Sequence, residues 1–130
     1  MGGIVMNWQD LALGLAGLIG SGVALVHGVL TQRLMVEPFR AMSTTARTPA
    51  TIRRLVPGLL HFSTYNWFLG GLALMVAAAW LGPQARLATA LLVGSSYLFG
   101  AAGNLWATRG RHPGWLLYAI ALGLIVYGVD

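Results

Sequence analysis

Apolar residues are gathered into four long runs along the chain, and short polar stretches separate them. The first three runs exceed the roughly 20 residues that a helix needs to cross a bilayer, and the last is at the lower limit. Short polar turns at 82–86 and 108–112 make consecutive helices antiparallel neighbours. The pattern predicts one domain over residues 1–130, an all-α polytopic membrane protein built as an antiparallel four-helix transmembrane bundle. The predicted spans cover about 8–30, 55–81, 86–108 and 113–129.

Composition supports this class of protein. Of the 130 residues, 57% are hydrophobic and only 8% are charged, whereas soluble domains carry about 25% charged residues. A chain this apolar has too little polar surface to cover itself in water. It contains no cysteine, which excludes disulfides, iron–sulfur clusters and cysteine-ligated zinc.

Small residues recur at helical spacing in three of the predicted spans. In lipid, such faces let two helix backbones approach closely, within one chain or between a chain and its partner. The sequence therefore predicts tight helix packing and leaves open whether a second copy or a partner membrane subunit takes part. The faces consist of Gly14, Gly17, Ser21, Ala24 and Gly28, of Gly70, Gly71, Ala73 and Ala77–Ala79, and of Ser96, Gly100, Gly103 and Ala107.

The charge pattern predicts an orientation. The net charge is +5 and every basic residue is an arginine. Seven of the eight arginines fall in 31–54 and 108–112, and only Arg86 falls in the opposite turn. The positive-inside rule places these arginine-rich segments in the cytoplasm and both termini outside, in a multi-pass protein of the inner (plasma) membrane. Nucleic-acid binding is disfavoured, because no basic face with interleaved aromatics lies on a soluble fold.

The longest connection, residues 31–54, is expected to be a cytoplasmic loop. Apolar residues alternate with charges between Leu34 and Met42, which predicts a short interfacial helix within the loop. Pro38 and Pro49 limit its length. Pro57 then fits the first turn of the second span, where a missing N–H costs little.

Three histidines fall on the cytoplasmic side of this topology: His27 ends the first span, His61 begins the second and His112 begins the fourth. Imidazole is a ligand for zinc, copper, iron and haem. His27 and His61 lie at compatible depths, so they are the candidate metal or haem ligands, with His112 and Glu37 as further candidates. The cofactor itself, haem or a divalent metal, stays open.

A structural interpretation of the same histidines is equally consistent with the sequence. Histidines near helix ends often lie among lipid headgroups, and His112, just before Pro113, is placed to cap the fourth helix. The spacing matches no HxxxH, HExxH or repeated ExxH pattern. Neither an enzyme nor a cofactor protein is therefore identified by motif.

Other polar residues near the same boundary are candidate substrate-binding groups. Asn66 lies deeper than His61 and needs a partner on another helix, which Asn104 is placed to supply. The alternative is that both amides face a substrate, and Tyr65 is compatible with either role. Four arginines form a basic rim that attracts anionic headgroups: Arg53, Arg54, Arg109 and Arg111.

Three functional hypotheses follow. The first is a small inner-membrane protein that binds a lipid or a partner protein through its glycine-rich helix faces and a polar pocket at the cytoplasmic boundary. The second is a haem- or metal-binding membrane protein with His27 and His61 as ligands. The third is a membrane enzyme or carrier for an anionic, lipid-like substrate, with His61 as candidate catalytic acid or base and the arginine rim gripping the head.

Overall fold

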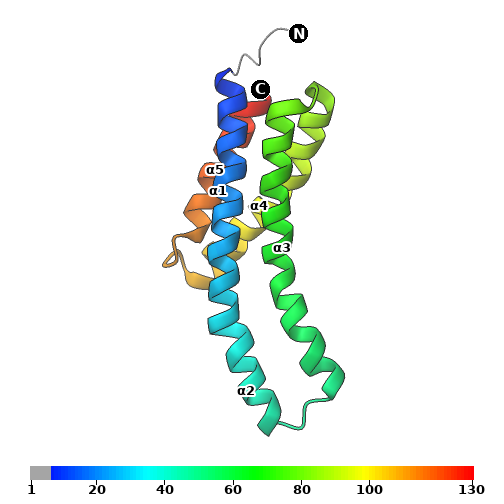
Figure 1. The fold of residues 1–130 in the computed structure, drawn as a ribbon. Coiled ribbons are helices and arrows are strands. Elements are labelled where there is room, and N and C mark those ends of the chain that lie inside the picture. The colour runs from blue at the N-terminus through cyan, green and yellow to red at the C-terminus, as the bar shows by residue number, and fades with distance from the viewer. Residues whose placement is uncertain (1–6) are drawn as a thin grey trace.

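A computed structural model describes residues 7–130, which form helices joined by short turns (Figure 1). α1 and α2 are joined without a break by a π-helix, so they make one long rod. With α3, α4 and α5 this gives an all-α protein of four helical rods. The elements are α1 (Trp8–Thr31), η1 (Gln32–Val36), α2 (Glu37–Thr45), α3 (Ala50–Trp80), α4 (Pro83–Thr108) and α5 (Gly114–Val129).

The rods form a bundle in which α1 lies between α3 and α5, while α4 packs against both α5 and α3. The start of α1, the end of α5 and the α3–α4 turn lie at one end (Figure 1). We call this end, which holds Arg86, the closed end. The predicted antiparallel order of the helices is confirmed.

Three helical stretches are long and apolar enough to cross a membrane: Trp8–Thr45, Ala50–Trp80 and Pro83–Thr108. The fourth predicted span is a shorter apolar helix, α5, with 16 residues. At about 1.5 Å per residue, α5 is about 24 Å long, less than the roughly 30 Å thickness of a hydrocarbon core.

The segment 31–54, expected to be a loop, is mostly helical. Only residues 46–49 form a turn, because α2 ends at Thr45 and α3 begins at Ala50. These helices make a hairpin, residues 32–60, that projects beyond the other two rods (Figure 1). We call this hairpin the arm. The expected short helix exists as α2, but it continues α1 rather than standing alone.

Each of the two helical segments of the arm contains a proline. Pro38 lacks the N–H that would bond to the carbonyl four residues earlier. The chain widens into η1 at this point, where the Glu37 N–H bonds to the Gln32 carbonyl, and the rod continues past the proline. Pro57 lies inside α3, seven residues after its start at Ala50, and not in the first turn as predicted.

Close approach of helix backbones holds the closed end together. Gly17 of α1 lies against the Gly71 carbonyl of α3, and Gly71 lies against the backbone and side chain of Ser21. On the other side of α1, a side chain on Gly128 of α5 would meet Leu13. The small-residue face of the first span therefore packs within the chain, against α3.

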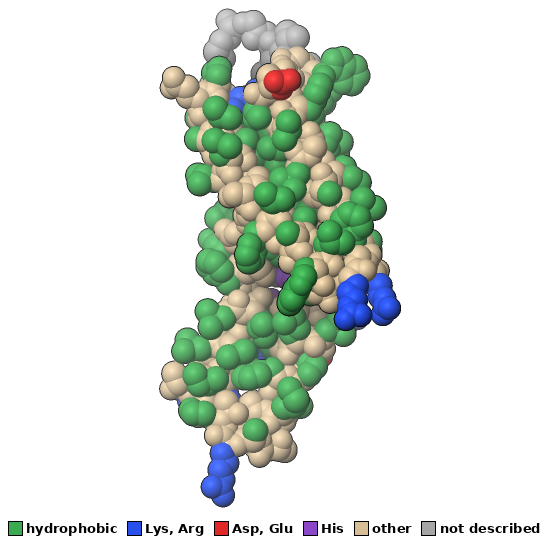
Figure 2. Space-filling model, turned by 180° about the vertical axis from the view of Figure 1, so that it is seen from behind, with side chains coloured by type: hydrophobic (Ala, Val, Ile, Leu, Met, Phe, Trp, Pro, Cys, Tyr) green, Lys and Arg blue, Asp and Glu red, His purple; other side chains and the backbone are tan. Residues whose placement is uncertain are grey.

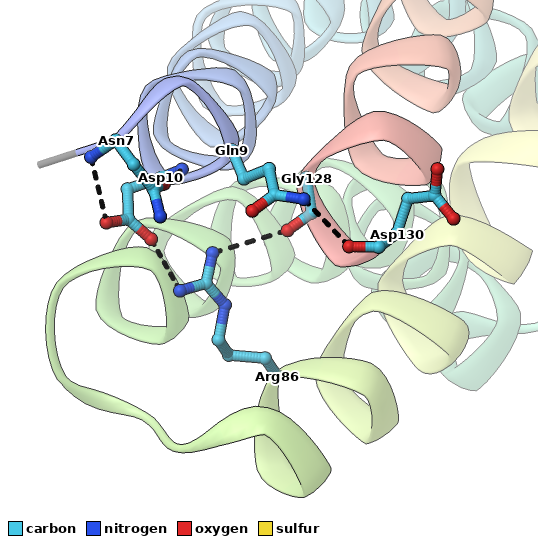
Figure 3. A network of polar contacts seen from close by, with 6 residues as sticks. All are labelled: Asn7, Gln9, Asp10, Arg86, Gly128 and Asp130. Atoms are coloured by element: carbon cyan, nitrogen blue, oxygen red, sulfur yellow. Dashed lines mark hydrogen bonds and ion pairs between the residues drawn. The ribbon is translucent and has the colours of Figure 1, made fainter.

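A polar network ties three helices at this end (Figure 3). Arg86 forms an ion pair with Asp10 and also donates to the Gly128 carbonyl at 3.3 Å. Gln9 donates to the Asp130 carbonyl at 2.8 Å. The single arginine of this end is thus neutralised and joins α4 to α1 and α5.

Candidate functional site

The other half of the bundle holds a partly open cavity of about 680 Å³ lined by α1, α3, α4 and α5. Figure 2 shows histidine atoms in a hollow about halfway along the molecule, bordered by hydrophobic side chains. The α1 wall is apolar and runs from Leu18 to Leu30. The other walls carry Ser63 and Trp67 from α3, Phe99, Gly100, Gly103 and Asn104 from α4, and His112, Pro113, Gly114, Leu117 and Tyr118 from the α5 side.

Two glycines leave part of this space open. Gly22 of α1 and Gly103 of α4 both line the cavity. A Cβ added to either would have no heavy atom of residues 7–130 within 4 Å, apart from its own helix and chain neighbours. Gly100, by contrast, is covered by the Trp67 ring. On the predicted small face of α4, Gly100 is therefore used for packing, whereas Gly103 is open to the cavity.

His27 lies in the cavity wall and is held by its neighbours. Its Nε2 is 3.0 Å from the Ser63 hydroxyl and 3.3 Å from that of Thr31. Its ring meets the Trp67 ring edge-on, with centroids 4.8 Å apart. The imidazole is therefore fixed in orientation, with Nε2 already engaged.

His112 and Asn104 cap α5, as predicted for His112. The Gly114 N–H donates to His112 Nδ1 at 3.1 Å, and the Trp115 N–H donates to Asn104 Oδ1 at 3.2 Å. Asn104 thus joins α4 to the start of α5. Because both side chains also line the cavity, their remaining polar atoms are left to face its contents.

His61 does not line the cavity. It donates from Nε2 to the Gln32 side-chain carbonyl at 2.8 Å, at the base of the arm. The proposed ligands His27 and His61 therefore engage different partners, Ser63 and Gln32. Within residues 7–130, no three His, Asp or Glu side chains are grouped so that they could hold a metal ion. The exposed Glu37 begins α2.

The predicted contact between two amides is replaced by another. Asn66 donates to the Ser96 hydroxyl at 2.9 Å, and not to Asn104. Asn66 and Tyr65 are both exposed and lie outside the cavity wall. The difference arises because Asn104 is used by the start of α5.

The four arginines of the predicted rim are exposed and none lines the cavity. Arg53 and Arg54 lie near the start of α3, in the arm. Arg109 ends α4 with a left-handed backbone (φ 52°), and Arg111 follows in the turn. The structure therefore separates a basic surface from an uncharged cavity.

An aromatic cluster in the cavity region was not predicted as a site. Tyr118 of α5 meets Trp67 with ring centroids 5.1 Å apart and Tyr97 at 4.7 Å. Tyr97 donates to the Trp67 carbonyl at 3.2 Å, whereas the buried Tyr118 hydroxyl has no hydrogen-bond partner among residues 7–130. The feature of the sequence that could have indicated this cluster is a tyrosine within a short, otherwise apolar span.

The fold and the cavity define a class: an all-α protein of four helices, three of them able to span a membrane, with a mostly apolar cavity beside a polar cluster. No protein-family model, curated protein or solved structure matches the chain.

Proposed function

We propose that this protein is a small integral protein of the inner membrane that binds a lipid-like amphiphile in the cavity. The proposal rests on the cavity itself, which combines a long, mostly apolar wall on α1 with polar side chains at one end. A lipid-like molecule has the same two parts. Burial of its apolar chain supplies affinity, and the polar cluster fixes the position of its head.

The proposed orientation places the arm and the α4–α5 turn in the cytoplasm, because they hold seven of the eight arginines. The arm also exposes apolar side chains, including Leu34, Met42 and Leu59. Arginines beside apolar side chains suit contact with anionic headgroups at a membrane surface. Membrane lipids are therefore the proposed partners of the arm.

Assembly through the glycine-rich faces receives less support than ligand binding. Gly17 and Gly71 cover each other, and Gly70 lies against Val93. These faces are occupied within one chain, so a second copy or partner subunit would have to use other surfaces. The enzyme or carrier hypothesis with His61 also loses support, since neither His61 nor any arginine lines the cavity.

The test is retention of a bound amphiphile by protein purified from membranes in mild detergent. Native mass spectrometry and lipid extraction should detect a bound amphiphile in the unaltered protein. Gly103→Leu should lose it, because the new side chain enters the cavity without meeting other helices. Gly123→Leu is the matched control: Gly123 is equally unobstructed but lies outside the cavity wall.

Equal retention by the two variants, or no bound amphiphile in any sample, would contradict the proposal. An absorption spectrum and metal analysis of the same samples address the haem or metal hypothesis. A Soret band or stoichiometric metal that disappears in His27→Ala and His61→Ala would favour that hypothesis instead.

A further inference from the structure

Two polar side chains of the cavity wall, His112 and Asn104, keep hydrogen-bond donors that are not used in capping α5. No Asp, Glu, Lys or Arg lines the cavity. His112 Nδ1 accepts the Gly114 N–H, so the proton of the neutral imidazole is on Nε2, which remains a donor.

Asn104 contributes further donors. Its Oδ1 accepts the Trp115 N–H, and since only the oxygen of an amide can accept, the side-chain NH₂ group is identified as the free part. The recorded side-chain hydrogen bond of Asn104 within residues 7–130 uses its Oδ1 and not this group. Asn104 therefore presents two N–H donors beside His112.

Tyr118 contributes to the cavity wall, but its hydroxyl does not face the cavity. The residue is 3% exposed, and the hydroxyl is buried and unpaired among the described residues. It is therefore out of reach of a molecule in the cavity.

An anionic head is poorly matched to these groups. The first N–H groups of a helix often bind anions, but those of Gly114 and Trp115 are already taken by His112 and Asn104. With no arginine in the wall, a buried anion would lack a counter-charge and would be strongly disfavoured. The donors instead suit neutral acceptors, and the rings of Trp67, Phe99 and Tyr118 suit a flat, conjugated head.

We propose that the amphiphile bound in this cavity has a neutral, carbonyl-bearing ring as its head, as a membrane quinone does. The ring carbonyls accept hydrogen bonds from Asn104 and His112, and the apolar tail lies along α1 between Leu18 and Leu30. This assignment rests on the proposed function, because it specifies the ligand class for the same cavity.

The experiment is titration calorimetry of the delipidated protein in detergent with three probes that share a decyl chain. Decyl-benzoquinone offers neutral carbonyls, decylbenzene offers no acceptor, and decanoate offers a charge. Decyl-benzoquinone should bind most tightly. Asn104→Asp keeps the oxygen that caps α5 and removes the donors, so it should weaken quinone binding about tenfold or more.

Tyr118→Phe removes the buried hydroxyl and breaks no bond recorded within residues 7–130. Because that hydroxyl does not face the cavity, this variant should leave the binding of both the quinone and decylbenzene unchanged. Tyr65→Phe, at an exposed position outside the cavity, is the matched control and should change neither.

The outcomes separate the two proposals. Equal binding of decylbenzene and the quinone, tighter binding of decanoate, or quinone binding unaffected by Asn104→Asp would overturn the assignment of the head while leaving an amphiphile-binding cavity. Binding of none of the probes, together with loss of the difference between Gly103→Leu and Gly123→Leu, would overturn both.

Discussion

The two halves of the bundle use the same small residues in opposite ways. At the closed end, Gly17 and Gly71 bring α1 and α3 into backbone contact. In the other half, Gly22 and Gly103 line the cavity, and a Cβ added to either would meet no other helix. A helix glycine thus marks a tight contact in one half and a cavity wall in the other, and the position of the neighbouring helix decides which.

Polar residues show the same contrast. At the closed end the polar groups are paired with each other, as in the contact of Arg86 with Asp10 and the Gly128 carbonyl. In the cavity half, His112 and Asn104 each use one polar atom to cap α5, and the other polar atom of each side chain remains available. The first arrangement supports stability alone, whereas the second is also suited to recognition.

The largest expected effect on stability is that of Gly71→Leu. Any side chain at this position meets the Gly17 carbonyl and Ser21, so α1 and α3 must separate, which should reduce the free energy of unfolding by about 3 kcal/mol. This loss of stability can be measured by thermal unfolding in detergent, with circular dichroism as the probe of helix content. Gly123→Leu is the control, and an unchanged unfolding temperature for Gly71→Leu would refute the close-contact role.

Arg86→Ala should have the next largest effect. Loss of the guanidinium leaves the part-buried Asp10 carboxylate and the Gly128 carbonyl without this donor, at a cost of about 2 kcal/mol. The double variant Asp10→Ala/Arg86→Ala should be less destabilised than the sum of the two single variants. Additive losses in the same unfolding measurement would show that the pair is not coupled.

The smallest effect contrasts two buried tyrosines. Tyr97→Phe removes the hydrogen bond to the Trp67 carbonyl and should reduce stability by about 1 kcal/mol. Tyr118→Phe removes a hydroxyl with no partner among residues 7–130, so the ligand-free protein should be equally stable or more stable. If Tyr118→Phe were the more destabilising variant in thermal unfolding, the hydroxyl would have a structural partner.

Several features were predictable because they depend on local chemistry. Long apolar runs fix the number and order of helices, and the Gly82-Pro83 and His112-Pro113 pairs mark helix boundaries that the structure confirms. The arm was less predictable, since prolines and arginines suggested a loop. A π-helical turn at Gln32–Val36 lets the helix pass Pro38, and the pattern of apolar and polar residues does not signal such a turn.

The cavity depends on tertiary geometry and was only partly predictable. His27, His112 and Asn104 were recognised as polar groups near one boundary, and they do line one cavity. His61 and Asn66 were grouped with them by depth, but depth does not specify which side of a helix a residue faces. Their partners, Gln32 and Ser96, lie elsewhere.

The unbroken rod from α1 to α2 has a mechanical consequence. Its 38 residues measure about 57 Å, nearly twice the thickness of a hydrocarbon core. One part of the rod is a wall of the cavity and the other is half of the arm, so the two move as parts of one lever. A tilt of roughly 10° about the middle of the rod displaces its tip by about 5 Å. A movement of the α1 wall of the cavity would thereby be transmitted to the arm.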